Sequence, residues 1–281
     1  MIAFAVRNLK LYFRDRASVF FSLLAVLITL GLYIGFLANT LTSGLDMPGA
    51  RFLMDSWMMA GLLAVTTVTT TLGAAGVLVD DRAKGIAKDF HCAPLQRSTI
   101  VGGYLLSSVA VGVLMTLAAF VLAEVYIVAN GGRLLPLAGA LKALGLIVLS
   151  TAASGALVSF LVSFLRTLNA FGVASTIIGT LSGFLMGIYV PVGLLPQGVQ
   201  AVIRIFPMSH AAVLLRQVFL EVPLAEAFQA APPPVVSAFQ EEMGVVFTVG
   251  EGVISSAVSI GFLLCSAAVF FVLTVWRMLK E

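Results

Sequence analysis

Hydrophobic residues are gathered into six long runs, each long enough to cross a lipid bilayer as a helix. The hydrocarbon core of a bilayer requires roughly 20 helical residues, and the runs are almost free of Asp, Glu, Lys and Arg. Their uniform apolar character differs from β-barrel strands, which alternate over segments of about 10 residues. The predicted spans are residues 19–38, 56–79, 99–128, 143–165, 168–190 and 253–276.

Composition supports this membrane assignment. The 281 residues are 60% hydrophobic and only 10% charged, whereas soluble domains carry about 25% charged residues. The mean hydropathy of +1.09 excludes a soluble enzyme, a disordered chain and a disulfide scaffold, because a soluble protein needs a largely polar surface. Cys92 and Cys265 lie in unlike settings and support no redox role. We therefore predict an all-α polytopic membrane protein, with residues 1–281 forming a single transmembrane domain.

The distribution of basic residues predicts the orientation. Lys and Arg are enriched in cytoplasmic loops, and eleven of them fall on one side of the six spans against five on the other. We therefore expect both termini and residues 80–98 in the cytoplasm, and residues 39–55 and 221–251 outside it.

Residues 1–17 have a helical rhythm of their own. Apolar and basic positions form neighbouring stripes, which is typical of a helix lying in the headgroup plane of the lipid bilayer. We favour a topology anchor over a dedicated binding surface, although the helix is also placed to contact a cytoplasmic partner. The apolar stripe is Ile2, Val6, Leu9 and Phe13, and the basic stripe is Arg7, Lys10 and Arg14.

Residues 80–98 form an unusually charged cytoplasmic loop. Residues 82–90 have the composition of a short helix, which Pro94 would end. A loop that only sets the topology needs less length, so the apolar positions within this charged helix favour a docking element. The expected docking residues are Arg82, Lys84, Gly85, Ile86, Lys88, Asp89 and Phe90.

Residues 187–251 begin with an interrupted hydrophobic run. Prolines and glycines divide it into residues 197–206 and 208–222, about 15 and 22 Å long as helices and too short to cross. We predict re-entrant helices buried by protein, with their arginines snorkelling to the outer interface, followed by an acidic extracytoplasmic excursion. The expected gate residues are Pro191, Pro196, Arg204, Pro207 and Arg216.

Three smaller features have two interpretations each. Gly179, Gly183 and Gly187 have the spacing that lets helices approach closely, either within the chain or in a dimer. The hydroxyls of the second span bond the preceding turn of their own helix or line a translocation path, and the path residues we expect are Thr66, Thr67, Thr70 and Glu124. Glu124 lies near the outer end of its span and favours an interfacial carboxylate.

The sequence lacks the motifs of several enzyme and metal-binding classes. The sequence contains no GxxxxGK[ST] phosphate loop, no HExxH and no GxSG, and His91 beside Cys92 lacks a second ligand pair for zinc. We therefore expect no catalytic or metal site, and a translocation subunit whose energy comes from outside the chain. The alternatives are an ion-coupled secondary transporter, with only hydroxyls and Glu124 as ligands, and a non-transporting sensor or assembly protein.

Three segments bear a family resemblance. RNLKLYFRDRASVFFSLL is similar to the interfacial helix and first span of the type 2 ATP-binding-cassette (ABC) exporter permeases. Residues 81–108 resemble the coupling-helix loop of that family, and residues 191–219 resemble its broken re-entrant helices. The resemblance covers nearly the whole chain.

The resemblance implies a set of partners. Two permeases, identical or homologous, would pair with two separate cytoplasmic ATPase subunits, which bind ATP and Mg. This chain would bind no cofactor and no nucleic acid, and would lie in a bacterial plasma (inner) membrane. Residues 221–251 are longer than in the polysaccharide-exporting members, which favours outward transport of an amphipathic drug, lipid or antimicrobial peptide.

Overall fold

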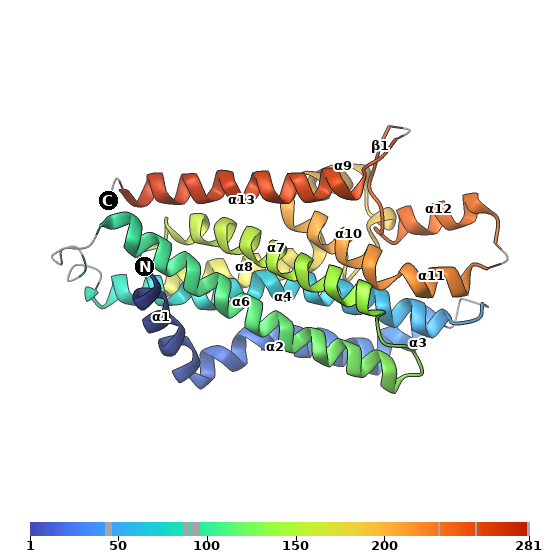
Figure 1. The fold of residues 1–281 in the computed structure, drawn as a ribbon, viewed down its shortest axis with the longest axis horizontal. Helices are drawn as coiled ribbons and strands as arrows, with labels where there is room; N and C mark the ends of the chain where they lie inside the picture. Colours follow the sequence, from blue (N-terminus) through green and yellow to red (C-terminus); the bar gives the residue numbers. More distant parts are fainter. Residues whose placement is uncertain (43–46, 87–89, 91–95, 230, 251, 280–281) are drawn as a thin grey trace.

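The computed structural model is a bundle of long helices that run roughly along one axis (Figure 1). It describes all residues except 43–46, 87–89, 91–95, 230, 251 and 280–281. The elements are α1 (Ile2–Arg14), α2 (Arg16–Leu32), the π-helical turn η1 (Tyr33–Leu37), α3 (Ala38–Thr42), α4 (Ala50–Ala83), α6 (Arg97–Ala129), α7 (Leu137–Val162), α8 (Leu168–Leu185), the 3-10 turn η2 (Val192–Leu194), α9 (Gln197–Ile205), α10 (Pro207–Phe219), α11 (Glu221–Ala227), α12 (Pro233–Glu242), β1 (Thr248–Val249), β2 (Gly252–Val253) and α13 (Ser256–Leu279).

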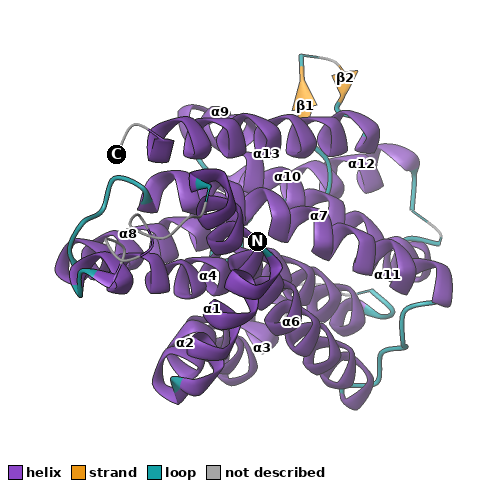
Figure 2. Cartoon of the chain, turned by 60° about the vertical axis from the view of Figure 1, so that its left-hand side comes forward, coloured by secondary structure: helices purple, strands orange, loops and turns teal. Residues whose placement is uncertain are grey.

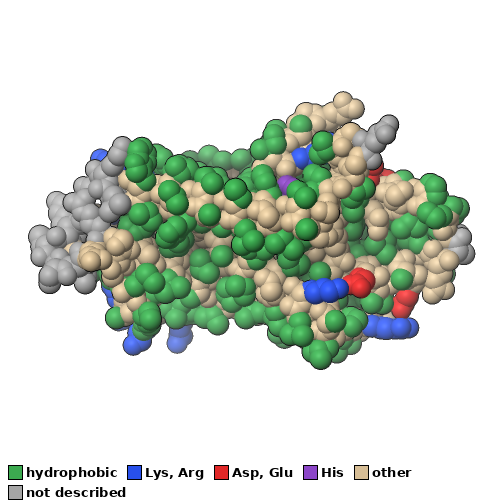
Figure 3. Space-filling model, turned by 45° about the horizontal axis from the view of Figure 1, so that its top comes forward, with side chains coloured by type: hydrophobic (Ala, Val, Ile, Leu, Met, Phe, Trp, Pro, Cys, Tyr) green, Lys and Arg blue, Asp and Glu red, His purple; other side chains and the backbone are tan. Residues whose placement is uncertain are grey.

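Six helices are long and apolar enough to span a membrane, and they correspond to the six predicted runs. This confirms the prediction of an all-α polytopic membrane protein. Hydrophobic side chains cover the middle of the molecule, while the charged side chains visible in Figure 3 lie toward its two ends. The candidate spans are residues 16–40, 50–83, 98–129, 137–162, 168–185 and 256–278.

The helices differ from the predicted runs by several residues at most ends, and two of these differences have a visible local cause. The fifth span ends at Leu185 rather than at residue 190, because the chain turns at Gly187, whose φ of +65° favours glycine. The last span begins at Ser256 rather than at residue 253, because β1 and β2 form a short hairpin before it (Figure 2).

Helix α4 is the centre of the bundle. Of its most hydrophobic 18-residue stretch, 83% is buried, against 24% for the first span and 11% for the fifth. It packs against α2, α6, α7, α8 and α10. The first and fifth spans therefore leave most of their apolar surface facing outward.

The broken helix is present as predicted. Helices α9 and α10 meet at an angle of 89°, and Pro207 occupies the first turn of α10. Nearly every residue of α10 is buried, as a non-spanning helix at membrane depth requires, whereas α9 buries only Ile203.

Both chain termini lie at one end of the bundle, and α11, α12 and the hairpin lie at the other (Figure 1). We call these the inner end and the outer end. Helix α1 packs across α6 at the inner end, with Ile2, Val6 and Phe13 of its apolar stripe exposed. Its buried side is Ala5, Asn8 and Tyr12, so one face of α1 contacts protein while the apolar stripe stays available to lipid.

Candidate functional site

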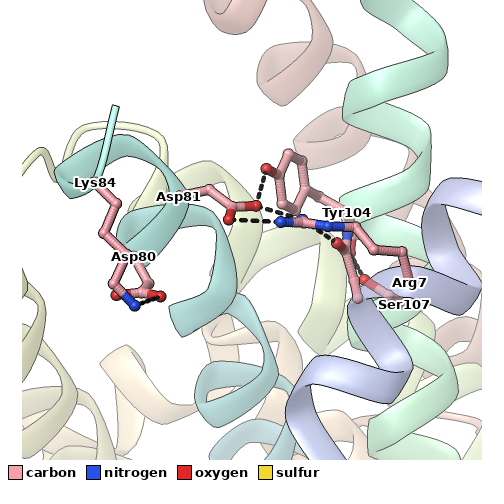
Figure 4. Close-up of polar contacts among 7 residues, drawn as sticks. Arg7, Asp80, Asp81, Lys84, Tyr104 and Ser107 are labelled. Carbon is pink, nitrogen blue, oxygen red and sulfur yellow. Dashed lines mark hydrogen bonds and ion pairs between the residues drawn. The ribbon is translucent and has the colours of Figure 1, made fainter. Parts of the chain in front are cut away.

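A buried carboxylate joins three helices at the inner end. Asp81, in the last turn of α4, is only 2% exposed. Arg7 of α1 donates to its two oxygens, from Nη1 at 2.6 Å and Nη2 at 2.9 Å, and Tyr104 Oη of α6 donates at 2.6 Å (Figure 4). Bidentate charge-assisted bonds of this kind fix geometry as well as energy. The three residues therefore tie α1, α4 and α6 together.

Aromatic rings surround this ion pair. The guanidinium of Arg7 lies 5.1 Å from the centre of the Phe90 ring and 5.7 Å from that of Phe4. Phe4 packs edge-to-face against both Phe90 and Tyr104, with ring centres 4.9 Å apart. The hydrogen bond to Asp81 holds the pKa of Arg7 above its ordinary value, so the guanidinium stays charged. We call Arg7, Asp81, Tyr104, Phe4 and Phe90 the inner clamp.

A second ion pair at the end of α4 is exposed. Lys84 Nζ lies 2.7 Å from Asp80 Oδ2, and Figure 4 shows this pair directed away from Asp81. Its hydrogen bond to Asp80 raises the pKa of Lys84, but solvent screens such a pair strongly. Gly85 then takes a left-handed conformation, φ +78°, which ends the helix.

Arg82 does not project into the docking loop. Its Nη1 donates to the carbonyl oxygens of Ser163 at 3.0 Å and Leu165 at 3.2 Å. These carbonyls follow α7, where a cation is favoured by the helix dipole. The expected helix beginning at Arg82 is thus corrected, because α4 continues to Ala83 and Arg82 fastens it to the α7–α8 connection.

The expected docking residues therefore separate into two groups. Lys84 is exposed and Ile86 half-buried, so both are accessible at the inner end. Arg82 and Phe90 contact other parts of the same chain. Lys88 and Asp89 lie outside the described residues.

A groove of about 810 Å³ opens on the side of the bundle between the α1–α2 elbow, α4 and α8. Positively and negatively charged side chains line its opening, and the rest of its lining is apolar with several hydroxyl groups. The charged lining residues are Arg14, Asp15, Asp80 and Lys84. The hydroxyl residues are Tyr12, Ser18, Ser22, Thr69 and Ser175, and the apolar ones include Leu11, Phe21, Leu72, Val77, Leu168 and Phe171.

The expected path threonines lie elsewhere on α4. Thr66, Thr67 and Thr70 are completely buried, and each hydroxyl donates to a carbonyl of the preceding turn at 2.6–2.7 Å. Thr67 also lies 3.0 Å from Ser154 of α7. Thr69, on another face of the helix, lines the groove instead, so three of the expected path residues belong to the core of the chain.

Glu124 is buried rather than interfacial. It is 8% exposed, and its Oε2 accepts a hydrogen bond from the backbone N–H of Leu135 at 3.0 Å. Its Oε1 has no hydrogen-bond partner among the described residues. The carboxylate therefore holds the α6–α7 connection at the outer end.

Arg216 corrects the expectation of snorkelling. It is 1% exposed and lies 4.8 Å from the centre of the Trp57 ring. Its Nη2 donates to the carbonyls of Met186 at 2.9 Å and Gly187 at 2.8 Å, and its Nη1 donates to Gly244 at 3.3 Å. These carbonyls end α8 and follow α12, and helix C-termini stabilise a cation.

The other gate residues lie at the ends of short elements. Pro191 precedes η2, Pro196 precedes α9 and Pro207 begins α10. Arg204 stays on α9, where its Nη2 donates to Gln200 Oε1 at 3.3 Å. The prolines thus define the shape of the outer elbow, and Arg216 anchors it.

At two of the three expected interface glycines, contacts or backbone geometry within this chain explain why the residue is glycine. A Cβ atom at Gly183 would lie 2.2 Å from the ring of Tyr189, and Gly187 has the positive φ of the turn. Gly179 has open space around it and lines the groove. Of the three, Gly179 alone presents an open position on α8.

A second buried carboxylate, absent from the sequence interpretation, lies near the outer end of α4. Asp55 is 1% exposed and accepts hydrogen bonds from Tyr33 Oη at 2.7 Å and from Arg51 Nε at 3.0 and 3.1 Å. No sequence pattern pairs Arg7 with Asp81 either. The available signal was that acidic residues border the second hydrophobic run, Asp55 before it and Asp80 and Asp81 after it.

Comparison with known proteins identifies the family. The model of a family described as ABC-2 family transporter protein matches residues 48–276. Among curated proteins, none matches the chain. The family match begins just before α4 and reaches into α13, so it includes the broken helix and five of the six candidate spans.

Proposed function

The chain belongs to the ABC-2 family of transporter membrane proteins, which makes it a transmembrane permease subunit rather than an ATPase, and we propose that it exports an amphipathic substrate outward. Separate cytoplasmic ABC ATPase subunits supply the energy. Two permeases, identical or homologous, complete the transporter.

The inner clamp supports the coupling part of this proposal. A force on α1 or Phe90 reaches Asp81 of α4 and Tyr104 of α6 through hydrogen bonds and ring contacts, not through a flexible loop. An ATPase docked against Lys84, Ile86 and the exposed part of Phe90 would therefore move three helices together. Both chain ends lie at the same end of the bundle, which we assign to the cytoplasm.

The groove is the single observation that carries the substrate class. Its mouth offers two cations and two anions, and its depth offers apolar side chains with hydroxyls. Ligand pockets commonly have volumes of about 300–1,000 Å³ and a few placed polar groups. A molecule with a polar head and an apolar body matches this arrangement.

A second permease would enclose the groove. Helices α2 and α8 flank it, and both spans leave most of their apolar surface exposed. Pairing across these helices would turn two open grooves into one central path. The α9–α10 elbow, with Arg216 at its anchor, lies toward the outer end of that path, which is where the substrate would leave.

The ion-coupled alternative gains no support from the expected ligands. The hydroxyls of Thr66, Thr67 and Thr70 are bonded to backbone carbonyls, and Glu124 bonds Leu135. None of these residues lines the groove.

Reconstitution tests the proposal. The permease is purified with the ABC ATPase that co-purifies with it and placed in lipid vesicles, and transport of cationic, anionic and neutral amphiphiles is measured with and without ATP. We expect ATP-dependent transport of at least one amphiphile toward the side opposite the ATPase. Transport that proceeds without ATP, or a permease that binds no ABC ATPase, would refute it.

A further inference from the structure

Two similar clusters occupy the two ends of α4. At the inner end Asp81 is bound by an arginine and a tyrosine, Arg7 and Tyr104. At the outer end Asp55 is bound by Tyr33 and Arg51. The two carboxylates lie about 39 Å apart along the helix axis, so each end of the central helix carries one buried acid with the same kinds of partners.

In both clusters one partner comes from the N-terminal arm, which we define as α1 with α2 and η1, residues 2–37. Arg7 of α1 reaches Asp81, and Tyr33 of η1 reaches Asp55. Between these two points the arm borders the groove, and the first span buries only 24% of its most hydrophobic stretch. The arm is thus bound to α4 by polar contacts near both ends, while its middle packs on α4 through one face of α2 and exposes the other.

Polar contacts matter more than apolar ones for holding such an arm in a membrane. Lipid tails are as apolar as Leu or Phe side chains, so exposing apolar surface to lipid costs little. Breaking a hydrogen bond to a buried carboxylate costs more, because Asp55 and Asp81 are only 1% and 2% exposed and a lost donor leaves a buried acceptor unsatisfied. The two clusters therefore control whether the arm stays on α4.

The outer cluster is the more extensive network. Besides Asp55, Arg51 donates from Nη2 to Tyr126 Oη of α6 at 3.1 Å and to Oδ1 of Asn130, the residue that follows α6, at 3.3 Å. These contacts join α4 to α6 and do not involve the arm. Tyr33, which is completely buried, supplies the hydrogen bond between the arm and Asp55, and its ring also packs against that of Tyr126 with ring centres 6.3 Å apart. The hydrogen bonds of Arg51 to Asp55 and Tyr126 do not depend on Tyr33, so they can persist when the arm moves.

The backbone at Tyr33 offers a way for this contact to open. Tyr33 begins the five-residue π-helical turn between α2 and α3. Single π-helical turns are wider than the α-helix and are found mostly at functional sites. Relaxing this turn to an α-helix would rotate the residues on one side of it relative to the other, and would carry the Tyr33 hydroxyl away from Asp55.

We propose that the Tyr33–Asp55 hydrogen bond is an outer latch on the groove, and that it opens during each transport cycle while the inner clamp stays closed. The inference rests on the proposed function in one respect: the groove is the substrate site that the latch controls. The arm would pivot about the inner clamp, and the groove would widen toward the outer end.

Accessibility of the groove tests the latch. Ser175 lines the groove, and its Oγ is buried with no hydrogen-bond partner among the described residues. Ser175→Cys, in a chain that also carries Cys92→Ser and Cys265→Ser, is labelled with N-ethylmaleimide in lipid nanodiscs without ATP. We expect Tyr33→Phe to raise the labelling rate about tenfold, since a hydrogen bond to a charged group is lost without loss of ring volume.

Tyr126→Phe is the matched control. It removes a hydroxyl from the same cluster but leaves the contact between the arm and Asp55 in place, so its labelling rate should stay within about twofold of the parent. Equal labelling in the parent and Tyr33→Phe, with unchanged thermal unfolding, would overturn the latch. A large increase in both variants would also overturn it, because the whole cluster and not the arm contact would then be responsible.

The labelling experiment is independent of the transport assay. It needs neither ATP nor the ATPase, so it decides the latch even if the reconstituted permease moves no amphiphile. Conversely, a latch that opens as expected in a protein without ATP-dependent transport would refute the proposed function alone.

Discussion

The guanidinium of Arg216 lies 4.8 Å from the centre of the Trp57 ring, in the interior of the bundle. No carboxylate is within ion-pair distance of it in the part of the chain that the structure describes. Its charge is compensated by the aromatic face and by carbonyls from the ends of α8 and α12. Three segments that are far apart in the sequence therefore depend on one side chain.

Arg216→Met should lower the free energy of unfolding by about 3 kcal/mol or more, because several buried carbonyls lose their donors. Arg216→Lys should lose less, since one ammonium group reaches fewer carbonyls. Thermal unfolding in detergent measures both. Arg204→Lys, on the largely exposed α9, should stay within about 0.5 kcal/mol of the parent; an equal loss there would contradict the anchoring role of Arg216.

The inner clamp should couple ATP hydrolysis to transport. Arg7→Gln and Asp81→Asn should each uncouple the two, because a buried partner is left unsatisfied. Combining them should do less harm than the sum of the single changes, by about 1 kcal/mol or more in a double-mutant cycle. Substrate-stimulated ATP hydrolysis of the reconstituted complex is the measurement. Strictly additive effects would show that the pair does not act as a unit.

Substitutions of Phe90 and Phe4 should distinguish docking of the ATPase from transmission of its movement to the membrane helices. Both rings belong to the inner clamp. Phe4 lies within α1 and packs against Phe90 and Tyr104, whereas Phe90 lies in the 80–98 segment where we place the ATPase contact. Phe90→Ala should weaken ATPase association by about tenfold or more, as loss of an interface anchor does. Phe4→Ala should reduce coupling with little effect on association. Pull-down from detergent measures association, and Lys84→Ala serves as the rim control.

The two glycines of α8 should respond differently to Leu. Gly183→Leu clashes with Tyr189 of the same chain and should lower thermal stability. Gly179→Leu has open space and should leave stability unchanged while weakening cross-linking between permeases. If Gly179→Leu leaves cross-linking unchanged, the paired face lies elsewhere on the chain.

Topology is tested with single cysteines and an impermeant thiol reagent. Cysteines at exposed positions within residues 39–55 and 221–251, such as Pro48 and Val235, should react from outside intact cells, and a cysteine at the exposed Lys84 should react only after permeabilisation. The reason is the enrichment of Lys and Arg on the side of residues 80–98. Labelling of residues 80–98 from outside would reverse the assignment of the two ends.

The sequence predicted the spans and the break between α9 and α10 because both depend on local properties. A run of apolar residues long enough to cross a bilayer can be read from the sequence. Pro207 favours the first turn of a helix whatever the tertiary fold around it. The end of α4 was less visible, since Asp81 and Arg82 look like loop charges although the helix continues through them.

The site depends on which helix faces meet, and a uniformly apolar helix does not reveal this. Thr66, Thr67 and Thr70 were assigned to a path although they face the core, while Thr69, close to them in sequence, lines the groove. The Arg7–Asp81 pair joins residues 74 positions apart. Only the folded arrangement of α1, α4 and α6 brings them together.

The length of α4 has a consequence for the membrane around it. As a helix its residues 50–83 extend about 51 Å, well beyond a hydrocarbon core of about 30 Å. With the helix centred in such a bilayer, Asp55 and Asp81 both lie at headgroup depth, where their ion pairs remain hydrated at the edge. Lipids with longer acyl chains would draw one cluster into hydrocarbon unless the helix tilted or the bilayer thinned around it. For a helix centred in this way, the spacing of two aspartates would make acyl-chain length a variable that acts on both clusters at once.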